Sequence, residues 1–429
     1  MPDLAQTTPP RQSYLPKIAT TFAEGYRLAD LRKDAAAGLT VAIVALPLSM
    51  AIAVASGVSP DRGLYAAIVG GFLVSALGGS RYQIGGPAGA FIVLVAATVA
   101  KFGVDGLLLA VLLSGAMLSL LGALRLGSLI RHIPQPVIVG FTCGIAVTIF
   151  ATQIKDLLGL SLSGAEPGPL IPKLAALAGA LPSLNPAAAG LSLAVIAVIL
   201  GLKRLRPAVP GMLVAVAAAS AAAALMGLPV ETIGTRFGGI PSGLPLPQLP
   251  EITTEKLVAI LPAAFSFTLL GGVESLLSAM VADGMAGSRH RSNMELIAQG
   301  VANIASALFG GISVTGTIAR TATNIRAGGR TPVAGMLHAL FLLMFMVLAA
   351  PLASYIPLAA LAGVLAVVAW TMAERREFAN LLKTGGPAVV LQTTFVLTVL
   401  HDLTAGILAG CAVAVLLWLP AAIARARRS

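Results

Sequence analysis

Charged residues are scarce in this sequence. Lys, Arg, Asp and Glu make up 10% of its 429 residues and hydrophobic residues make up 57%, whereas a soluble protein carries about 25% charged residues. Apolar runs near the roughly 20 residues that a helix needs to cross a bilayer recur from Gly38 to Pro420. The composition therefore excludes a soluble domain with a single anchor and predicts an all-α polytopic membrane protein.

Cysteine, histidine and catalytic motifs are also nearly absent. Cys143 and Cys411 lie in apolar runs and are interpreted as small hydrophobic residues, so neither a disulfide nor a zinc site is expected. The four histidines form no metal-ligand cluster, and neither a nucleophile motif nor a phosphate-binding loop occurs. We therefore expect no enzyme activity, no metal and no cofactor.

Acidic residues are outnumbered, with 17 Asp and Glu against 28 Lys and Arg and a net charge of +11. The basic residues sit in short loops between apolar runs, which is typical of membrane topology and not of nucleic-acid binding. The polar first 33 residues lack the apolar core of a secretory signal peptide. Placing the N-terminus in the cytoplasm puts most basic residues on that side, and an even number of spans then places both termini there.

The apolar runs and their polar breaks predict fourteen transmembrane spans. The stretch Leu170 to Leu181 is too short to cross and is expected to be a surface or interfacial helix. The predicted spans are 38–56, 63–79, 88–101, 105–124, 136–154, 187–202, 208–228, 257–282, 296–310, 317–328, 333–350, 356–373, 387–400 and 403–420.

Two similar strings suggest that the spans form an inverted repeat. Ser75–Gly79 (SALGG) recurs as Ser306–Gly311 (SALFGG), about half the chain later, and seven spans per half would make the halves cross in opposite senses. The predicted organisation is a cytoplasmic segment at 1–33, a first seven-span repeat at 34–228, an extracellular connection at 229–256, a second repeat at 257–420 and a basic cytoplasmic C-terminus at 421–429.

Each string is followed by a glycine-rich or small-residue segment, Ile84–Ala90 (IGGPAGA) and Ile312–Arg320 (ISVTGTIAR). Both predict an extended lead at membrane depth and a half-helix that begins near Ala88 or Thr317. Extended backbone is tolerated there only when it is buried in protein or lines a wet cavity. Helices that begin in mid-membrane present free N–H groups and a positive dipole end, so the pair predicts a site for a small anion.

Two charged residues inside predicted spans, Arg320 and Glu274, are candidates for the site. Arg320, one turn beyond Thr317, offers a planar fork suited to oxyanions or carboxylates, or else satisfies loose carbonyls beside the broken helix. Glu274 is costly there unless it is paired or protonated, which makes it a candidate proton carrier. The alternative is an ion pair between the two that locks their helices together. Asp283 and Glu295 flank a cytoplasmic loop, and we expect them to be solvated.

Several longer motifs carry a resemblance to a known family. The sequence resembles the sulfate permease family, solute carrier family 26, from Asp34 to about Pro420. The motifs are Asp34–Ala42 (DAAAGLTVA) with Leu46-Pro47, Gly140–Val147 (GFTCGIAV), Gln153–Gly159 (QIKDLLG), Asn293–Asn303 (NMELIAQGVAN), Phe309–Gly311 (FGG), Thr315–Thr321 (TGTIART) and His401–Ile407 (HDLTAGI).

The resemblance implies a seven-plus-seven inverted repeat with half-helices at spans three and ten. A core domain would hold spans one to four and eight to eleven, and a gate domain the other six. It also implies a homodimer in a bacterial inner membrane, working by alternating access. Relatives continue into a cytoplasmic STAS domain, whereas this sequence stops at Ser429, so we expect a truncation.

The resemblance also implies the site. Many relatives carry Gln at the position of Leu48 and a bulky aromatic at Ala88, so the pocket is expected to be roomier and less polar. The expected substrate-binding residues are Leu48, Ser49, Ile52, Ala88, Gly89, Gly316, Thr317, Ile318 and Arg320, with Glu274 as the proton-coupling residue.

The expected function is secondary active transport of a small anion. The favoured form is a proton-coupled symporter of a fumarate-like dicarboxylate, or of bicarbonate or sulfate. The alternatives are a passive anion exchanger or channel of the same fold, and a membrane sensor that binds an anion without moving it. The expected partners are the anion, protons, the lipid bilayer and a second copy of the chain, with no nucleic acid.

Overall fold

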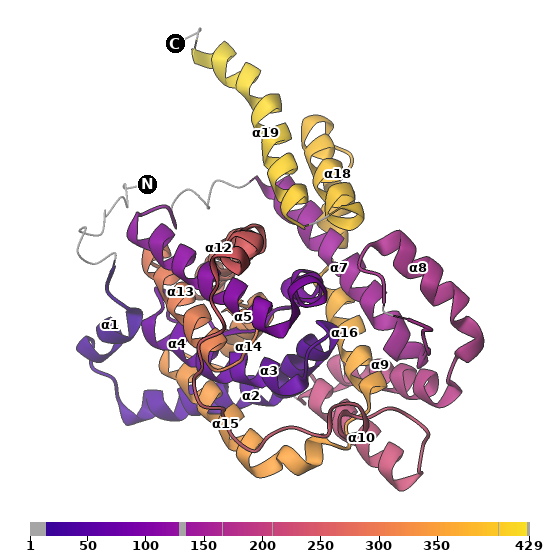
Figure 1. Ribbon diagram of the computed structural model, residues 1–429. Coiled ribbons are helices and arrows are strands. Elements are labelled where there is room, and N and C mark those ends of the chain that lie inside the picture. The colour runs from indigo at the N-terminus through magenta and orange to yellow at the C-terminus, as the bar shows by residue number, and fades with distance from the viewer. Residues whose placement is uncertain (1–13, 128–133, 165, 208, 402, 427–429) are drawn as a thin grey trace.

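The computed structural model describes residues 14–127, 134–164, 166–207, 209–401 and 403–426, and most of this is helix (Figure 1). The elements up to the first half of the chain are α1 (Lys17–Ala23), α2 (Leu28–Ala55), α3 (Pro60–Tyr65), the π-helix η2 (Ala66–Gly70), α4 (Gly71–Leu77), β1 (Gly85–Gly86), the 3₁₀ turn η3 (Gly89–Phe91), α5 (Ile92–Ala123), α7 (Gln135–Leu158), α8 (Leu170–Gly179), η4 (Leu181–Ser183), α9 (Pro186–Leu205), α10 (Gly211–Leu225) and α11 (Ile233–Phe237).

The second half continues the same pattern of helices with one short strand. Its elements are α12 (Thr254–Ala286), α13 (Ser292–Leu308), β2 (Thr315–Gly316), α14 (Ile318–Arg326), α15 (Val333–Ala353), α16 (Leu358–Met372), α17 (Arg375–Leu381), α18 (Gly385–Leu400) and α19 (Leu403–Ala426).

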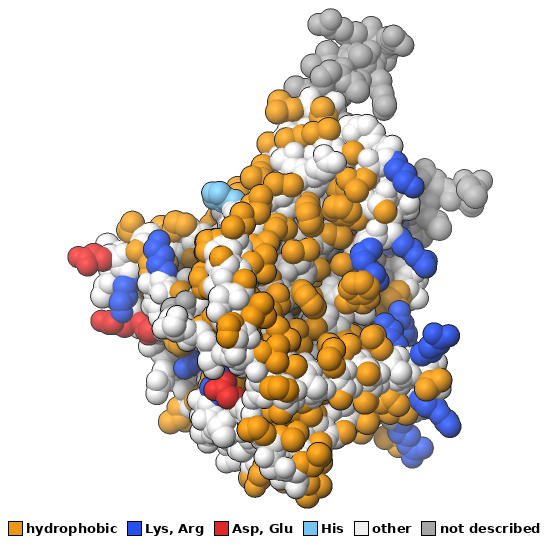
Figure 2. Space-filling view, turned by 90° about the vertical axis from the view of Figure 1, so that its right-hand side faces the viewer, with side chains coloured by type: hydrophobic (Ala, Val, Ile, Leu, Met, Phe, Trp, Pro, Cys, Tyr) orange, Lys and Arg blue, Asp and Glu red, His pale blue; other side chains and the backbone are white. Residues whose placement is uncertain are grey.

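Each of the fourteen predicted spans overlaps a helix. In the described residues, seven helical stretches are long and apolar enough to cross a membrane, and four more are apolar but shorter. Figure 2 shows hydrophobic side chains over much of one face, as expected for a multi-pass membrane protein. The count of fourteen crossings and the inverted relation of the halves remain predictions.

Local sequence explains several helix boundaries. The Asn185 side chain accepts the N–H groups of Ala187 and Ala188 at the start of α9, and the Thr253 hydroxyl accepts the Lys256 N–H at the start of α12. Helix α12 ends at Gly287, whose φ of 64° is left-handed and favours glycine. Predicted spans three and four are joined in α5, but Gly103 interrupts the helix with a φ of 71°. The stretch predicted as a surface or interfacial helix forms α8, whose Ile171 is exposed, and its place relative to the membrane stays a prediction.

The helices pack in two groups. One group consists of α2, α3, α4, α5, α12, α13, α14 and α15; the other consists of α7, α9, α10, α16, α18 and α19. Contacts between α2 and α16 join the two groups, and α18 and α19 project from one end of the molecule (Figure 1). The two groups hold the helices expected for core and gate, and the division into moving domains stays a prediction.

Close helix packing depends on glycine. A Cβ atom on Gly115 of α5 would lie 2.6 Å from the carbonyl oxygen of Gly300 of α13, and a Cβ on Gly122 would lie 2.6 Å from that of Asn293. Small residues let helix backbones approach in membrane proteins, where dispersion and hydrogen bonding replace the hydrophobic driving force. The α5–α13 contact matters for the site because α13 supports the extended segments described below.

Replacing Gly300 with alanine should therefore destabilise the fold. The added Cβ would lie 2.1 Å from the Ser119 hydroxyl oxygen and 2.4 Å from the Gly115 carbonyl oxygen, and overpacking of this kind costs about 1–3 kcal/mol. We expect a lower thermal unfolding midpoint for the purified Gly300→Ala protein. Gly190→Ala in α9 is the matched control, since no atom lies within 4 Å of its added Cβ. Equal midpoints for Gly300→Ala and wild type would contradict the packing argument.

Candidate functional site

Two extended segments from opposite halves of the chain pair at the centre of the first helix group. Strand β1 pairs with β2 in antiparallel register, with Gly85 opposite Gly316 and Gly86 opposite Thr315. The Thr317 N–H extends this β1–β2 pairing, called the ladder below, by donating to the Ile84 carbonyl at 3.1 Å. All six residues are buried. The predicted extended leads are therefore confirmed, and they satisfy part of each other's backbone hydrogen bonding.

A helix begins directly after each strand, as predicted. Ala88 is the N-cap residue of η3, which continues into α5, and Thr317 is the N-cap residue of α14. Both have extended backbone, with φ of −119° and −105°, and neither side chain caps its helix. The Thr317 hydroxyl is buried without a hydrogen-bond partner. Because the strands are antiparallel, the helices leave the ladder in opposite directions, and both positive dipole ends lie beside it.

Arg320 lies at the junction of the ladder and α2. Its side chain is 2% exposed, and its Nη2 donates to the Ser49 hydroxyl at 3.0 Å while its Nη1 donates to the Gly85 carbonyl at 3.3 Å. Its Nε has no partner. Only glycine fits at position 86, because a Cβ there would lie 1.5 Å from Arg320 Nη1. The guanidinium is thus held in place by neutral groups, and its positive charge is not cancelled by an ion pair within the described residues.

Glu274 lies on the face of α12 that contacts the ladder. Its helix neighbours Gly271 and Ser275 accept hydrogen bonds at their carbonyl oxygens from Thr315 and Gln83, and Ser278 bonds Thr321 of α14. Glu274 itself is partly exposed, but its Oε2 is buried without a partner. The ion pair with Arg320 considered as a lock is not formed in the described structure.

The structure places the remaining predicted substrate residues around the same centre. Leu48, Ser49 and Ile52 are buried on α2 just beyond Pro47, and the Ser49 hydroxyl also donates to the Ala45 carbonyl at 2.6 Å. Gly89 and Gly316 adjoin the two helix starts. Ile318 differs from the others because its side chain is 40% exposed. The site is therefore built from α2, α12 and the two strand–helix junctions.

Sequence reasoning missed the side chains that hold the extended segments. The Asn303 side chain of α13 binds both the N–H and the carbonyl of Val314, at 2.9 and 2.7 Å. On the other segment, the Thr321 hydroxyl accepts the Ile84 N–H at 3.1 Å, and Asn324 donates to the Tyr82 carbonyl at 2.9 Å. Asn303 belongs to a quoted motif, so polar residues inside an otherwise apolar span were the available signal.

The expectation that Glu295 is solvated is wrong. Its side chain is fully buried on α13, and its Oε2 accepts the N–H groups of Gly79 and Ser80 at 2.9 and 3.1 Å. Its Oε1 accepts the Gln299 amide at 2.9 Å. Glu295 lies at the end of a loop in sequence, but the turn that leads to β1 folds over it and removes it from water. The carboxylate therefore anchors the start of the first extended segment.

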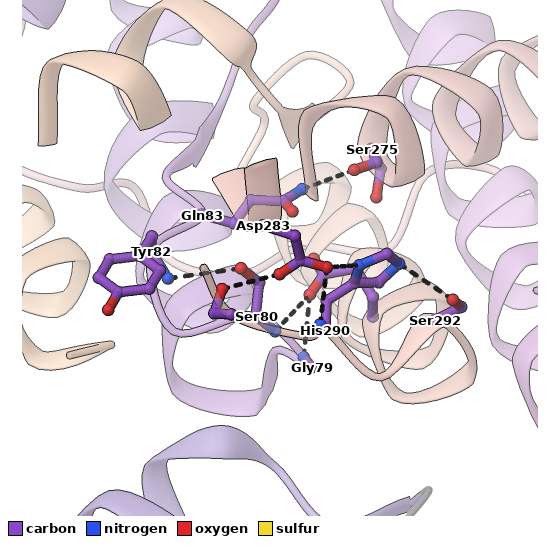
Figure 3. Close-up of polar contacts among 10 residues, drawn as sticks. Gly79, Ser80, Tyr82, Gln83, Ser275, Asp283, His290 and Ser292 are labelled. Carbon is purple, nitrogen blue, oxygen red and sulfur yellow. Dashed lines mark hydrogen bonds and ion pairs between the residues drawn. The ribbon is translucent and has the colours of Figure 1, made fainter. Parts of the chain in front are cut away.

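Asp283 is also bonded instead of simply solvated. Its Oδ2 accepts the backbone N–H of His290 at 2.9 Å and lies 2.6 Å from His290 Nδ1, while Nε2 of the same ring lies 3.0 Å from the Ser292 hydroxyl. Figure 3 shows this group beside the turn at Gly79 and Ser80, with Gln83 reaching toward Ser275. These hydrogen bonds hold the loop between α12 and α13 in place. His132, one of the four histidines, lies outside the described residues.

Removing the Glu295 charge should loosen the first extended segment. Glu295→Gln keeps the side-chain shape but puts an amide where a carboxylate accepts two backbone N–H groups, and hydrogen bonds to charged groups contribute about 1.5–3 kcal/mol each. We expect a lower unfolding midpoint and faster amide hydrogen exchange at Gly79 and Ser80. Glu255→Gln, at an exposed position of α12, should leave both unchanged. Unaltered exchange at Gly79 and Ser80 in Glu295→Gln would argue against the anchor.

The sequence is similar to known proteins along most of its length. A model of the sulfate permease family matches residues 31–392. YvdB of Bacillus subtilis (strain 168), a sulfate transporter candidate by name, is 45% identical over 390 residues, which are 90% of this chain and 73% of that protein.

Solved structures show the same fold. The transmembrane domain of a cyanobacterium bicarbonate transporter, BicA, matches with a TM-score of 0.81 at 32% identity and covers 89% of this chain and 98% of that one. A murine solute carrier 26 family member, A9, described as an anion transporter in the inward-facing state, matches with a TM-score of 0.86 over 97% of this chain and 72% of that one. At 19% identity, that second match shows the fold alone.

The family model spans most of the sequence, and the quoted motifs Asp34–Ala42, Asn293–Asn303 and Thr315–Thr321 fall on α2, on α13 and at the second strand–helix junction. The expected family is confirmed: this chain belongs to the sulfate permease family.

Proposed function

We propose that this chain is a secondary active transporter that moves a small anion together with protons. The observation that carries the proposal is the arrangement at the ladder. Two helices begin there without side-chain caps, and the buried Arg320 beside them has no acidic partner within the described residues. An uncancelled positive charge next to two positive dipole ends favours an anion.

The substrate class follows from the donors at the site and from the relatives. The Thr317 hydroxyl and Arg320 Nε are buried without partners, so they are free to donate to an oxygen-rich anion. Named relatives are assigned to sulfate and bicarbonate. The small Ala88 leaves room for a larger anion, which supports a fumarate-like dicarboxylate as a further candidate.

Glu274 supplies the proposed coupling. Its Oε2 is buried without a hydrogen-bond partner on the face of α12 that contacts the ladder, so this oxygen is available to carry a proton. Anion binding would bring negative charge to the same site, so a proton on Glu274 would lower the electrostatic cost of loading both.

We propose the following setting for the transporter. In Figure 2, one edge of the hydrophobic surface shows Lys and Arg without acidic side chains, whereas the opposite side shows acidic side chains together with further Lys and Arg. The positive-inside rule makes the basic edge cytoplasmic, with both termini on that side of a bacterial inner membrane. The two helix groups would move relative to each other as core and gate, within a homodimer.

Uptake by proteoliposomes tests the anion site. We expect one of labelled sulfate, bicarbonate, fumarate or chloride to accumulate, and Arg320→Ala to raise its half-saturating concentration by at least about tenfold, since losing one partner of a buried charged contact costs about 2–5 kcal/mol. Arg320→Lys keeps the charge and should recover part of the loss. The control is Arg326→Ala, at an exposed position of the same helix. Normal affinity and rate in a folded Arg320→Ala protein would remove Arg320 from the site.

The coupling role of Glu274 predicts a specific pH effect. Acidifying the outside should increase uptake by the wild-type protein, because the inward proton gradient drives symport. Glu274→Gln cannot exchange a proton, so its uptake should be insensitive to the gradient, whereas Glu255→Gln should behave like wild type. Gradient-independent wild-type uptake that requires an anion on the opposite side would identify an exchanger instead, and single-channel currents would identify a channel.

A further inference from the structure

A basic pocket lies at the opposite end of α14 from the ladder. A cavity of about 450 Å³ opens between the N-terminal part of α2 and the turn that joins α14 to α15. Its lining residues are Arg32, Lys33, Ala36, Ala327, Gly328 and Arg330. Half of the lining is cationic, and the rest consists of small residues that leave the charged groups accessible.

The positive charge of this pocket is largely uncancelled. Arg32 and Lys33 are exposed and form no ion pair with any described residue, and Arg326 at the end of α14 is in the same situation. Arg330 forms an ion pair with Asp30, with 3.5 Å between Nη1 and Oδ1. The oxygens of the other nearby carboxylate, Asp34, are occupied by backbone and side-chain donors.

The occupied Asp34 carboxylate has a structural role. It is buried, and it accepts the N–H groups of Arg330 and Thr331 at 2.8 and 3.2 Å. These bonds fix the α14–α15 turn against α2, so the pocket wall is preformed. A preformed wall that carries several unneutralised cations attracts a multivalent anionic group.

The pocket also borders a surface suited to lipid chains. Ala36 is exposed, and one helical turn further along α2 the exposed Leu39 and Thr40 lie on the same side. Beyond this point α2 carries no charged residue as far as Ala55. The cations therefore lie where the helix changes from a polar to an apolar environment, which is the depth of phospholipid headgroups.

We propose that this pocket binds the phosphate-bearing headgroup of an anionic phospholipid, with the acyl chains lying along the exposed face of α2. Basic pockets at the cytoplasmic ends of transmembrane helices bind acidic headgroups in this way. The lipid would connect the N-terminal part of α2 to the end of α14. These helices also carry Ser49 and Arg320, so lipid binding stabilises the packing behind the ladder. The proposal does not depend on which anion is transported.

Lipid titration of the purified full chain tests the proposal. Phosphatidylglycerol, added to the protein in detergent, should raise the thermal unfolding midpoint and remain bound in native mass spectrometry, whereas phosphatidylcholine with the same chains should do neither. The double variant Arg32→Gln, Lys33→Gln should weaken phosphatidylglycerol binding by at least about tenfold, since each basic residue near an anionic lipid contributes about 1 kcal/mol. The matched control is Lys203→Gln, Arg204→Gln, which removes two exposed charges from the end of α9 and should bind like wild type.

Three results would overturn the proposal. The first is equal stabilisation by the two lipids, and the second is unchanged phosphatidylglycerol binding in the α2 double variant with an unchanged midpoint in detergent alone. The third is stabilisation by inorganic phosphate that equals the lipid effect and is lost in the α2 variant, because that result would assign the pocket to a soluble anion. If the α2 variant unfolds, the single variants Arg32→Gln and Lys33→Gln are each expected to show a partial loss of binding.

Discussion

Extended backbone inside a membrane protein has to find its hydrogen-bond partners within the protein, and this constraint organises the centre of the structure. The segments before α5 and α14 meet it by pairing with each other, since Gly85 and Gly86 lie opposite Gly316 and Thr315. Each strand has only two paired residues, which leaves other backbone groups of the extended segments without strand partners. Side chains bond to these remaining N–H and carbonyl groups. Asn303 serves one segment and Thr321 serves the other.

The supports of the ladder explain why polar residues occur in apolar helices. Glu295 holds the turn at Gly79 and Ser80 from α13, and the same helix carries Asn303 two turns later. Helix α13 can reach both segments because it packs tightly on α5 through Gly115 and Gly300. The helix packing and the position of the site are therefore linked: a change in the α5–α13 distance would displace the groups that hold the ladder.

The same constraint distributes the charges of the site. Arg320 is held by the Ser49 hydroxyl and the Gly85 carbonyl, both neutral, so its charge remains available. Glu274 lies on α12, whereas Arg320 lies on α14, and no ion pair joins the two side chains in the described residues. An anion and a proton could then be accommodated without first breaking a strong ion pair, which would lower the barrier between loaded and empty states. In the proposed transporter, the helix ends attract substrate while the two side chains set affinity and coupling.

The sequence by itself determined the membrane class, the helical ranges and the two points where helices begin late. These follow from local properties, because apolar length predicts a span and the glycine-rich run before Ala88 resists helix formation. Arg320 and Glu274 were also apparent, since charge is rare in an apolar span. Only the tertiary structure decided their partners. It paired Arg320 with Ser49 and not with Glu274, and it buried Glu295 beneath a turn that is more than 200 residues away in sequence. Hydropathy and spacing describe each segment in isolation, whereas burial and hydrogen bonding depend on which distant segments fold against it.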